Sequence, residues 1–268
     1  MSIRVFSFGG GVQSTAALVL AAQGRVDFRE FVFANVGEDS EYPGTLTYLE
    51  EHARPFAAAH GLALTEVRKH TRDGAPDSVL GRLYRTKRSV PIPMRMSNGA
   101  PGTRPCTIDF KIKVIAAHLK ARGATAAAPA VVGLGISADE YQRVNAHSTQ
   151  AWTTREFPLI FPHRLTREDC RNLITGAGLP VPPKSSCWFC PFHSPAHWAR
   201  MRREEPALFA AAAELEAFVN TKRGALGRDQ VWLTRFNKPL PMAVPDGGQL
   251  GLFDGEETDT CESGYCMT

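Results

Sequence analysis

The sequence lacks the features that would place it in a membrane or send it out of the cell. No apolar run reaches the ~18 residues that a membrane-spanning helix needs, and the stretch from Thr15 to Ala22 stops at Gln23 and Gly24. Residues 1–8 lead straight into a glycine-rich segment, without the basic-then-apolar order of a secretory signal. No internal repeat is visible. We therefore expect a cytoplasmic protein without membrane contacts.

Charge of a single sign is also scarce. The 268 residues include 31 Lys and Arg against 27 Asp and Glu, for a formal net charge of +4. This excess is too mild to indicate a nucleic-acid partner by itself, although it is compatible with an anionic substrate. With 43% hydrophobic residues, the chain can bury one α/β core and carry an appendage.

Only six cysteines are present, so their spacing is the informative property. In a reducing cytosol, thiols are more often metal, cluster or redox ligands, or core residues, than halves of disulfides. The six are Cys106, Cys170, Cys187, Cys190, Cys261 and Cys266. Cys170 falls within a predicted helix, and we expect it to be a core thiol.

Short apolar runs alternate with segments of helical spacing along the first 150 residues. The predicted strands are 3–8, 30–36, 64–67 and 130–134, and the predicted helices are 16–23, 48–60 and 111–122. Such alternation is typical of a parallel sheet covered by helices on both faces. The sequence therefore predicts an α/β protein with a doubly wound, mostly parallel sheet.

A glycine-rich segment, Gly9 to Thr15, lies between the first predicted strand and the first predicted helix. Backbone N–H groups that converge at a helix N-terminus bind phosphate, because the amides and the helix dipole together offset its negative charge. The segment has neither the lysine of a Walker loop nor the glycine spacing of a Rossmann fold. A triple glycine alone also fits a tight turn, and its position between strand and helix favours a phosphate site.

A second glycine pair, Gly133 and Gly135, closes the strand predicted at 130–134. Glycine lets a ligand approach the backbone closely, and open α/β sheets bind ligands in the crevice beyond the carboxyl ends of their strands. Asp139 and Arg143 follow with the i,i+4 spacing of a helical ion pair, so a solvated surface turn is the alternative.

Together these motifs resemble the PP-loop superfamily, and within it the phosphoadenosine-phosphosulfate (PAPS) reductase family, which includes reductases and ATP-dependent sulfur-transfer enzymes. The family's loop pattern, Ser-Gly-Gly-x-Asp-Ser, falls on residues 9–14, with Gly9 in place of the first serine and Gln13 in place of the aspartate. The similarity continues in order over about the first 195 residues, through segments at 34–37, 42–45, 106–111, 135–143 and 157–160.

The resemblance implies an adenine nucleotide alpha-hydrolase-like fold that binds ATP with Mg²⁺. It implies catalytic roles for Ser14, Lys111 and Arg143, with the planar fork of Arg143 contacting phosphate or sulfate. For Lys111, an exposed first-turn lysine is the alternative. The nucleotide contacts that the resemblance implies are Gly9, Gly10, Gly11, Gln13, Ser14, Thr15, Ala34, Asn35, Gly135, Asp139, Glu140 and Arg143.

We expect three regions along the chain: a PP-loop nucleotide-binding domain at 1–150, a cysteine-bearing helical module at 151–245, and an acidic, mobile tail at 246–268. Residues 81–105 are rich in Arg, Pro, Met and Gly without clear periodicity, which predicts a long loop or lid. Its basic residues fit an anionic partner such as tRNA or DNA, a lid over a nucleotide, or a plain solvated face. They are Arg82, Arg85, Lys87, Arg88 and Arg95.

Cys187 and Cys190 are spaced so that both thiolates of one tight turn can reach a single ion or cluster. The resemblance suggests Cys106 as a third ligand, because its segment is similar to the family's cysteine-bearing stretch. Three cysteines on a [4Fe-4S] cluster leave one iron open, and in iron–sulfur sulfur-transfer enzymes of the PP-loop class the sulfur is held there.

Other uses of the cysteines stay open. A zinc site would use Cys187, Cys190, His193 and His197, or the tail pair Cys261 and Cys266, although the first set is cramped compared with a zinc finger. A redox pair, or no metal at all, is the remaining alternative.

The favoured hypothesis is an ATP-dependent, adenylating sulfurtransferase with a nucleic acid or nucleotide as acceptor and a sulfur donor protein as partner. One alternative is an adenylylsulfate or phosphoadenylylsulfate reductase that releases sulfite. The Glu-Cys-Gly-Leu-His motif of the reductases is absent, and residues 261–266 are only partly similar to it. The other alternative is a non-catalytic subunit that binds a nucleotide or nucleic acid.

Overall fold

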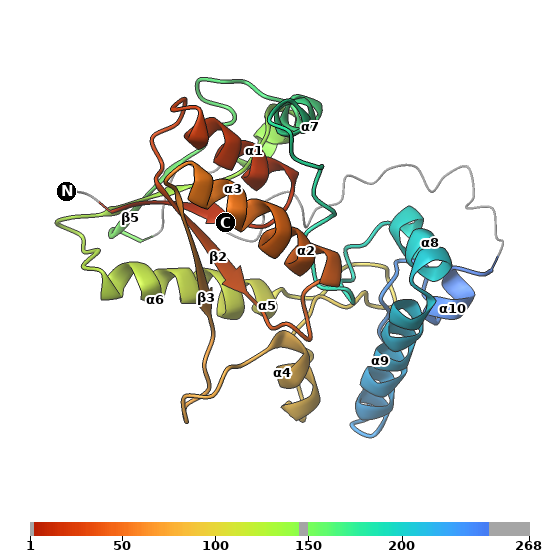
Figure 1. Cartoon of the computed structure of the whole chain (residues 1–268). Coiled ribbons are helices and arrows are strands. Elements are labelled where there is room, and N and C mark those ends of the chain that lie inside the picture. The colour runs from red at the N-terminus through yellow and green to blue at the C-terminus, as the bar shows by residue number, and fades with distance from the viewer. Residues whose placement is uncertain (1–2, 145–149, 247–268) are drawn as a thin grey trace.

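Five parallel strands form the centre of the protein. The computed structural model describes residues 3–144 and 150–246. Its strands are β1 (Arg4–Phe8), β2 (Glu30–Asn35), β3 (Ala63–Arg68), β4 (Ala130–Gly133) and β5 (Thr153–Glu156). Their order is β3-β2-β1-β4-β5, and every neighbouring pair is parallel (Figure 1). The expected α/β architecture with a parallel sheet is confirmed, and the sheet includes a strand beyond residue 150.

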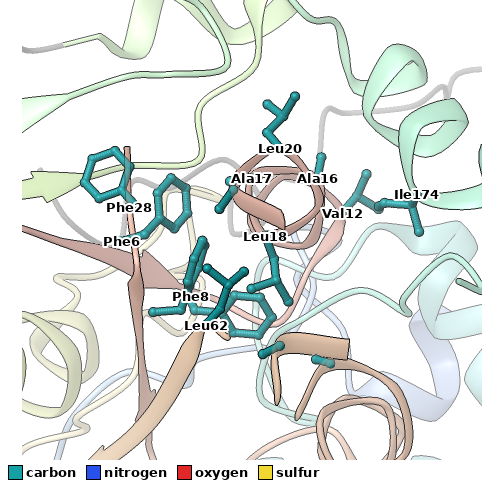
Figure 2. Close-up of a cluster of buried hydrophobic side chains, with 14 of the residues drawn as sticks. Phe6, Phe8, Val12, Ala16, Ala17, Leu18, Leu20, Phe28, Leu62 and Ile174 are labelled. Atoms are coloured by element: carbon teal, nitrogen blue, oxygen red, sulfur yellow. The ribbon is translucent and has the colours of Figure 1, made fainter. Parts of the chain in front are cut away.

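Alternating side chains of the central strands build a core on each face of the sheet. Phe6 and Phe8 of β1 pack with Phe31 on one face, in the cluster drawn in Figure 2. Val5 of β1 and Val32 of β2 pack on the other face. This period of two is what a pleated strand buried on both sides requires, and it explains why these strands read as continuous apolar runs.

Helices cover both faces of the sheet. One face carries α1 (Val12–Ala22), the linked segments α2 (Pro43–Tyr48), η1 (Leu49–Ala53) and α3 (Arg54–Ala59), and also α7 (Arg167–Gly176) (Figure 1). The other carries α6 (Lys113–Ala121), which follows α5 (Pro105–Thr107) and the π-helical turn η2 (Ile108–Ile112). Within the described ranges, no helix combines the length and apolar character that crossing a membrane requires.

A second apolar cluster lies beside the sheet, around Trp198 and Phe189. It joins α4 (Val79–Arg85) to α8 (Pro195–Glu204), α9 (Pro206–Gly224) and α10 (Leu240–Ala243). Glu216 of α9 is buried there, and its two carboxylate oxygens accept hydrogen bonds from the backbone N–H groups of Leu233 (2.6 Å) and Leu240 (2.7 Å). The chain that follows α9 is thereby fastened back onto that helix.

Residues 81–105, expected to form a loop, begin inside a helix. Ser78 caps α4 by accepting a hydrogen bond from the N–H of Gly81 at 2.9 Å, which is a strong helix-start signal. The remainder is irregular up to α5, but Ile92 and Met94 are buried in the second cluster. This stretch is therefore anchored at its middle by apolar side chains.

Candidate functional site

The order in which strands are added to the sheet reverses between β1 and β4. The chain passes from β1 outward to β2 and β3 on one side, and β4 and β5 occupy the other side. In open parallel sheets, ligands bind in the crevice beyond the carboxyl ends of the strands at such a point. The glycine segments that follow β1 and β4 both lie at this edge, as the sequence analysis predicts.

The glycine loop is a tight turn that only small residues can form. Gly10 has φ +79°, and a Cβ there would lie 2.9 Å from Cγ2 of Thr45. The Ser14 hydroxyl accepts a hydrogen bond from the N–H of Gly11 at 3.1 Å and donates one to its carbonyl at 3.0 Å. The turn is thereby fixed over the first turn of α1, where backbone N–H groups and the helix dipole favour an anion.

Gly135, beyond β4, packs directly onto this helix start. A Cβ there would lie 3.3 Å from the backbone nitrogen of Ser14 and 3.3 Å from Cβ of Gln13. These distances are closer than a side chain accepts without displacement of the backbone. The absence of a side chain at Gly135 therefore allows the two glycine segments to pack together where the crevice of an open parallel sheet is expected.

A buried polar network connects the two sides of the crevice. Nε2 of Gln13 donates to Oε2 of Glu140 at 3.2 Å and lies 3.4 Å from the hydroxyl of Ser137. Arg143 forms an ion pair with the same Glu140 oxygen at 2.7 Å, and its side chain is only 4% exposed. Burial raises the pKa of Glu140 above its usual value even though Arg143 opposes the shift. Asp139, considered above as the partner of Arg143, accepts a hydrogen bond from the N–H of Arg167.

The end of β2 is held by its own side chains. Asn35 donates from Nδ2 to Glu66 at 3.0 Å and accepts from the N–H of Gly37 at 2.8 Å, so both ends of its amide have structural partners. Ala34 beside it is buried, as is Thr15 in α1. Of the implied nucleotide contacts in this part of the chain, Ala34 and Thr15 are thus buried, and the Asn35 side chain shapes the turn after β2.

The segment with the two closely spaced cysteines is docked on the glycine loop. The Ser185 hydroxyl donates a hydrogen bond to the carbonyl of Gly9, and Cys187 forms a β-bridge with Glu41 beyond β2. The indole N–H of Trp188 donates to the carbonyl of Asp39 at 2.8 Å. The sequence analysis did not identify Ser185. The pair of serines immediately before Cys187 could have indicated it.

Two of the three cysteines proposed as ligands, Cys187 and Cys190, share one turn, and Cys106 precedes η2. Cys190 donates its N–H to the carbonyl of Cys187 at 3.1 Å, which closes the turn. Cys106 and Cys187 pack against the second apolar cluster, to which Phe189 of the Cys187–Cys190 turn belongs. The four cysteines within the described residues form no disulfides. In this same part of the chain, no three Cys, His, Asp or Glu side chains already lie close enough together to hold one metal ion.

Cys170 is a core thiol, as predicted. It is fully buried in the cluster between α7 and α1, and burial raises its pKa to about 12. Cys261 and Cys266 lie outside the described residues.

Two buried histidines follow the cysteine turn. The rings of His193 and His197 stack with centroids 3.8 Å apart. Nε2 of His193 lies 3.0 Å from the carbonyl of Cys187, and Nδ1 of His197 lies 3.0 Å from the guanidinium of Arg200. A carbonyl can only accept and a guanidinium can only donate, so each neutral ring carries its proton on Nε2. In this form Nδ1 of His193 has a lone pair for a metal. Nε2 of His197 carries a proton and Nδ1 of His197 accepts from Arg200, so His197 offers no lone pair to a metal.

Burial keeps these rings neutral. It is the main cause that lowers the pKa of His193 well below its usual value, with further contributions from His197 and Lys184. Burial also lowers the pKa of His197 to about 3, assisted by Lys184 and Arg200.

The five basic residues considered as a polyanion site do not form one set. Arg82 is paired with Asp109 and Arg85 with Asp77. The Arg95 guanidinium lies 5.3 Å from the centre of the Phe192 ring. Lys87 and Arg88 are exposed. Lys111 is half-buried in η2, on the side of the sheet covered by α6.

Comparisons with known proteins leave the family of this chain open. A search against protein-family models finds no match, and a search of curated proteins finds none either. The functional conclusion therefore rests on the geometry of the crevice and on the resemblance described above.

Proposed function

We propose that this chain is an ATP-dependent, adenylating sulfurtransferase of the PP-loop class, with an adenine nucleotide alpha-hydrolase-like fold and a cysteine-bearing C-terminal module. The observation that carries the proposal is the hydrogen bond from Ser185 to the carbonyl of Gly9. It holds the Cys187–Cys190 turn against the loop suited to phosphate. Thiols and nucleotide phosphates would then meet in one crevice.

In the first step, the glycine loop would hold the phosphates of ATP and Mg²⁺ at the start of α1. An oxygen of the acceptor attacks the α-phosphorus, the bond to the β-phosphate breaks, and pyrophosphate leaves. In the second step, a sulfur nucleophile attacks the acceptor carbon and AMP leaves with that oxygen. Arg143, which is paired with Glu140, would offset developing phosphate charge. Lys111 and Ser14 are the further residues proposed to act here.

The donor chemistry of the cysteines fits an iron–sulfur cluster. Cys187 and Cys190 belong to one turn, Cys106 packs against the same apolar cluster, and soft thiolates are the ligands that such clusters use. When bound by these three residues, a [4Fe-4S] cluster would supply an open iron at which sulfur is held. Binding would require the three thiolates to come closer together than they are among the described residues. The form of His197 described above favours the cluster over zinc held by both histidines.

Product analysis tests this function directly. With ATP, a sulfide source and candidate RNA or DNA acceptors, the anaerobically purified protein should release pyrophosphate and AMP. Release of sulfite from adenylylsulfate would instead establish the reductase alternative. ATP binding without either product would establish a non-catalytic subunit. Iron and sulfide content, measured on the same sample, decides between cluster and zinc.

A further inference from the structure

A cluster of cations lies where the end of α4 meets the end of α9. Arg228 donates from Nη1 to the carbonyl of Arg88 at 2.7 Å, and the ammonium of Lys222 donates to the carbonyls of Leu83 (3.0 Å) and Thr86. These contacts bring together two segments about 140 positions apart in the sequence. We call the resulting surface the basic platform; its residues are Tyr84, Lys87, Arg88, Lys222, Arg223 and Arg228.

Among the described residues, the cations of the basic platform have no carboxylate partners. Within the described ranges, none of its five cations forms an ion pair with a carboxylate, whereas Arg82 and Arg85 of the adjoining helix both do. Lys222 and Arg223 also lie in the last turn of α9, where cations offset the helix dipole. That role does not extend to Lys87 or Arg88, which are exposed. Uncompensated positive charge of this kind attracts a polyanion.

An exposed aromatic side chain borders these cations. Tyr84 is 51% exposed, and its ring packs on Phe218 with centroids 4.9 Å apart. The ammonium of Lys222 lies 5.1 Å from the centre of the Phe218 ring. A supported, outward-facing ring beside cations is the arrangement on which an unpaired base stacks while its phosphates are neutralised.

The groove between the two segments is small. It contains about 260 Å³ of empty space, and four of its lining residues are cations while none is acidic. Because part of this space is open solvent, the groove is not an enclosed pocket. It suits a phosphodiester group on the surface better than an enclosed nucleotide.

The basic platform is connected to the crevice through α4. The N–H of Val79, at the start of this helix, donates to the carbonyl of Val36 beyond β2 at 2.9 Å, and Ser78 donates to Asp39 at 2.8 Å. A helix of seven residues spans about 10 Å. A strand bound at the far end of α4 would therefore lie within a few nucleotides of the crevice.

From these observations we infer that the basic platform binds single-stranded nucleic acid, with phosphates on Lys87, Arg88 and the end of α9 and a base stacked on Tyr84. The inference rests on the proposed function only in making this strand the acceptor of sulfur.

The test compares two double variants that remove the same charge. Lys87→Ala/Arg88→Ala changes the basic platform, and Arg25→Ala/Arg29→Ala removes two exposed cations near the amino end of β2, at the opposite edge of the sheet. Fluorescence anisotropy with labelled single-stranded RNA and DNA is measured over a range of salt concentrations. The slope of log K against log salt is negative, and in the platform variant its magnitude should fall by roughly 1.4, because each phosphate contact on a single strand contributes about 0.7. The matched variant should leave the slope unchanged.

Tyr84→Ala tests the stacking, with Tyr84→Phe as its conservative counterpart. Affinity for single strands should fall roughly five-fold or more with alanine and be kept with phenylalanine. Equal losses from the two double variants, no effect of Tyr84→Ala, or equally tight binding of duplex would overturn the inference. ATP-dependent pyrophosphate release is measured on the same samples. Lost strand binding and lowered strand-dependent pyrophosphate release in the platform variant, with its affinity for an ATP analogue kept, support the inference. Absent turnover with intact strand binding in the parent protein contradicts the proposed function alone.

Discussion

The glycine loop and the cysteine turn that is docked on it are built in different ways; we call them the glycine side and the cysteine side. On the glycine side, the geometry is local: Gly10, Gly11 and Ser14 form the turn among themselves and Gly135 packs onto it. On the cysteine side, the turn is placed by contacts between distant segments, such as that from Ser185 to Gly9 across 176 positions. The turn on the glycine side therefore has its geometry without a bound ligand. On the cysteine side, the donors are gathered and a bound group would have to draw them together.

The strongest test of the glycine side is Gly10→Asp, which should abolish ATP binding. A side chain at φ +79° would press against Thr45, and its carboxylate would stand where phosphate is expected. Calorimetric titration with a non-hydrolysable ATP analogue measures the effect. Gly9→Ala is the matched variant, since the nearest neighbour of its Cβ would be the Ser14 hydroxyl at 4.0 Å, and it should bind within a few-fold of the parent. Unchanged affinity in a folded Gly10→Asp protein would remove this loop from the nucleotide site.

The cysteine side is tested by single alanine variants. Replacing Cys106, Cys187 or Cys190 should remove most of the iron and the broad absorption near ~400 nm that iron–sulfur clusters show. Cys170→Ala is the control, because this thiol is buried between α1 and α7. Iron and sulfide analysis after anaerobic purification gives the readout. Stoichiometric zinc without iron in the parent protein would contradict the cluster, and retained iron in the Cys106 variant would leave that residue outside the site.

A third test concerns the network that joins the two glycine segments. Glu140→Ala removes the carboxylate that pairs with the buried Arg143 and should lower the free energy of unfolding by about 3 kcal/mol. Asp139→Ala, next to it and exposed, should cost less than about 1 kcal/mol. Urea denaturation of both variants gives the comparison. Similar losses from the two would show that the ion pair does not stabilise the crevice.

The difference between the two sides also explains what the sequence could predict. Apolar runs located β1 to β4 within a few residues, since strands inside a parallel sheet are largely apolar. The strand β5 was missed, because its sequence, Thr-Thr-Arg-Glu, is polar and none of its residues is buried. The glycine loop was found because its geometry depends on neighbours in the chain. Ser185 and the carboxylates of Asp77 and Asp109 were missed, because their partners are set by packing between distant segments. For the same reason, the five basic residues of 81–105 looked alike in sequence although ion pairs separate them in the structure.

The smallest effect we predict compares two carboxyl groups, the buried Glu216 of α9 and the half-buried Glu66 of β3. Burial raises the pKa of Glu216, in the second cluster, although two backbone N–H groups oppose the shift. Burial alone would also raise the pKa of Glu66, behind Asn35, but hydrogen bonds from Arg68 and Asn35 lower it overall.

These opposite directions give opposite dependences on pH. A raised pKa in the folded state stabilises the protein below the unfolded value, about 4.3, and this contribution is lost as the pH rises through the folded value. A lowered pKa stabilises it above the unfolded value, and this contribution is lost as the pH falls through the folded value. Unfolding by urea at a series of pH values, for the parent, Glu216→Gln and Glu66→Gln, isolates each carboxyl group. Relative to its glutamine variant, the parent should lose stability with rising pH at position 216 and gain it at position 66. Slopes of the same sign would show that the polar contacts around these two groups do not differ as described.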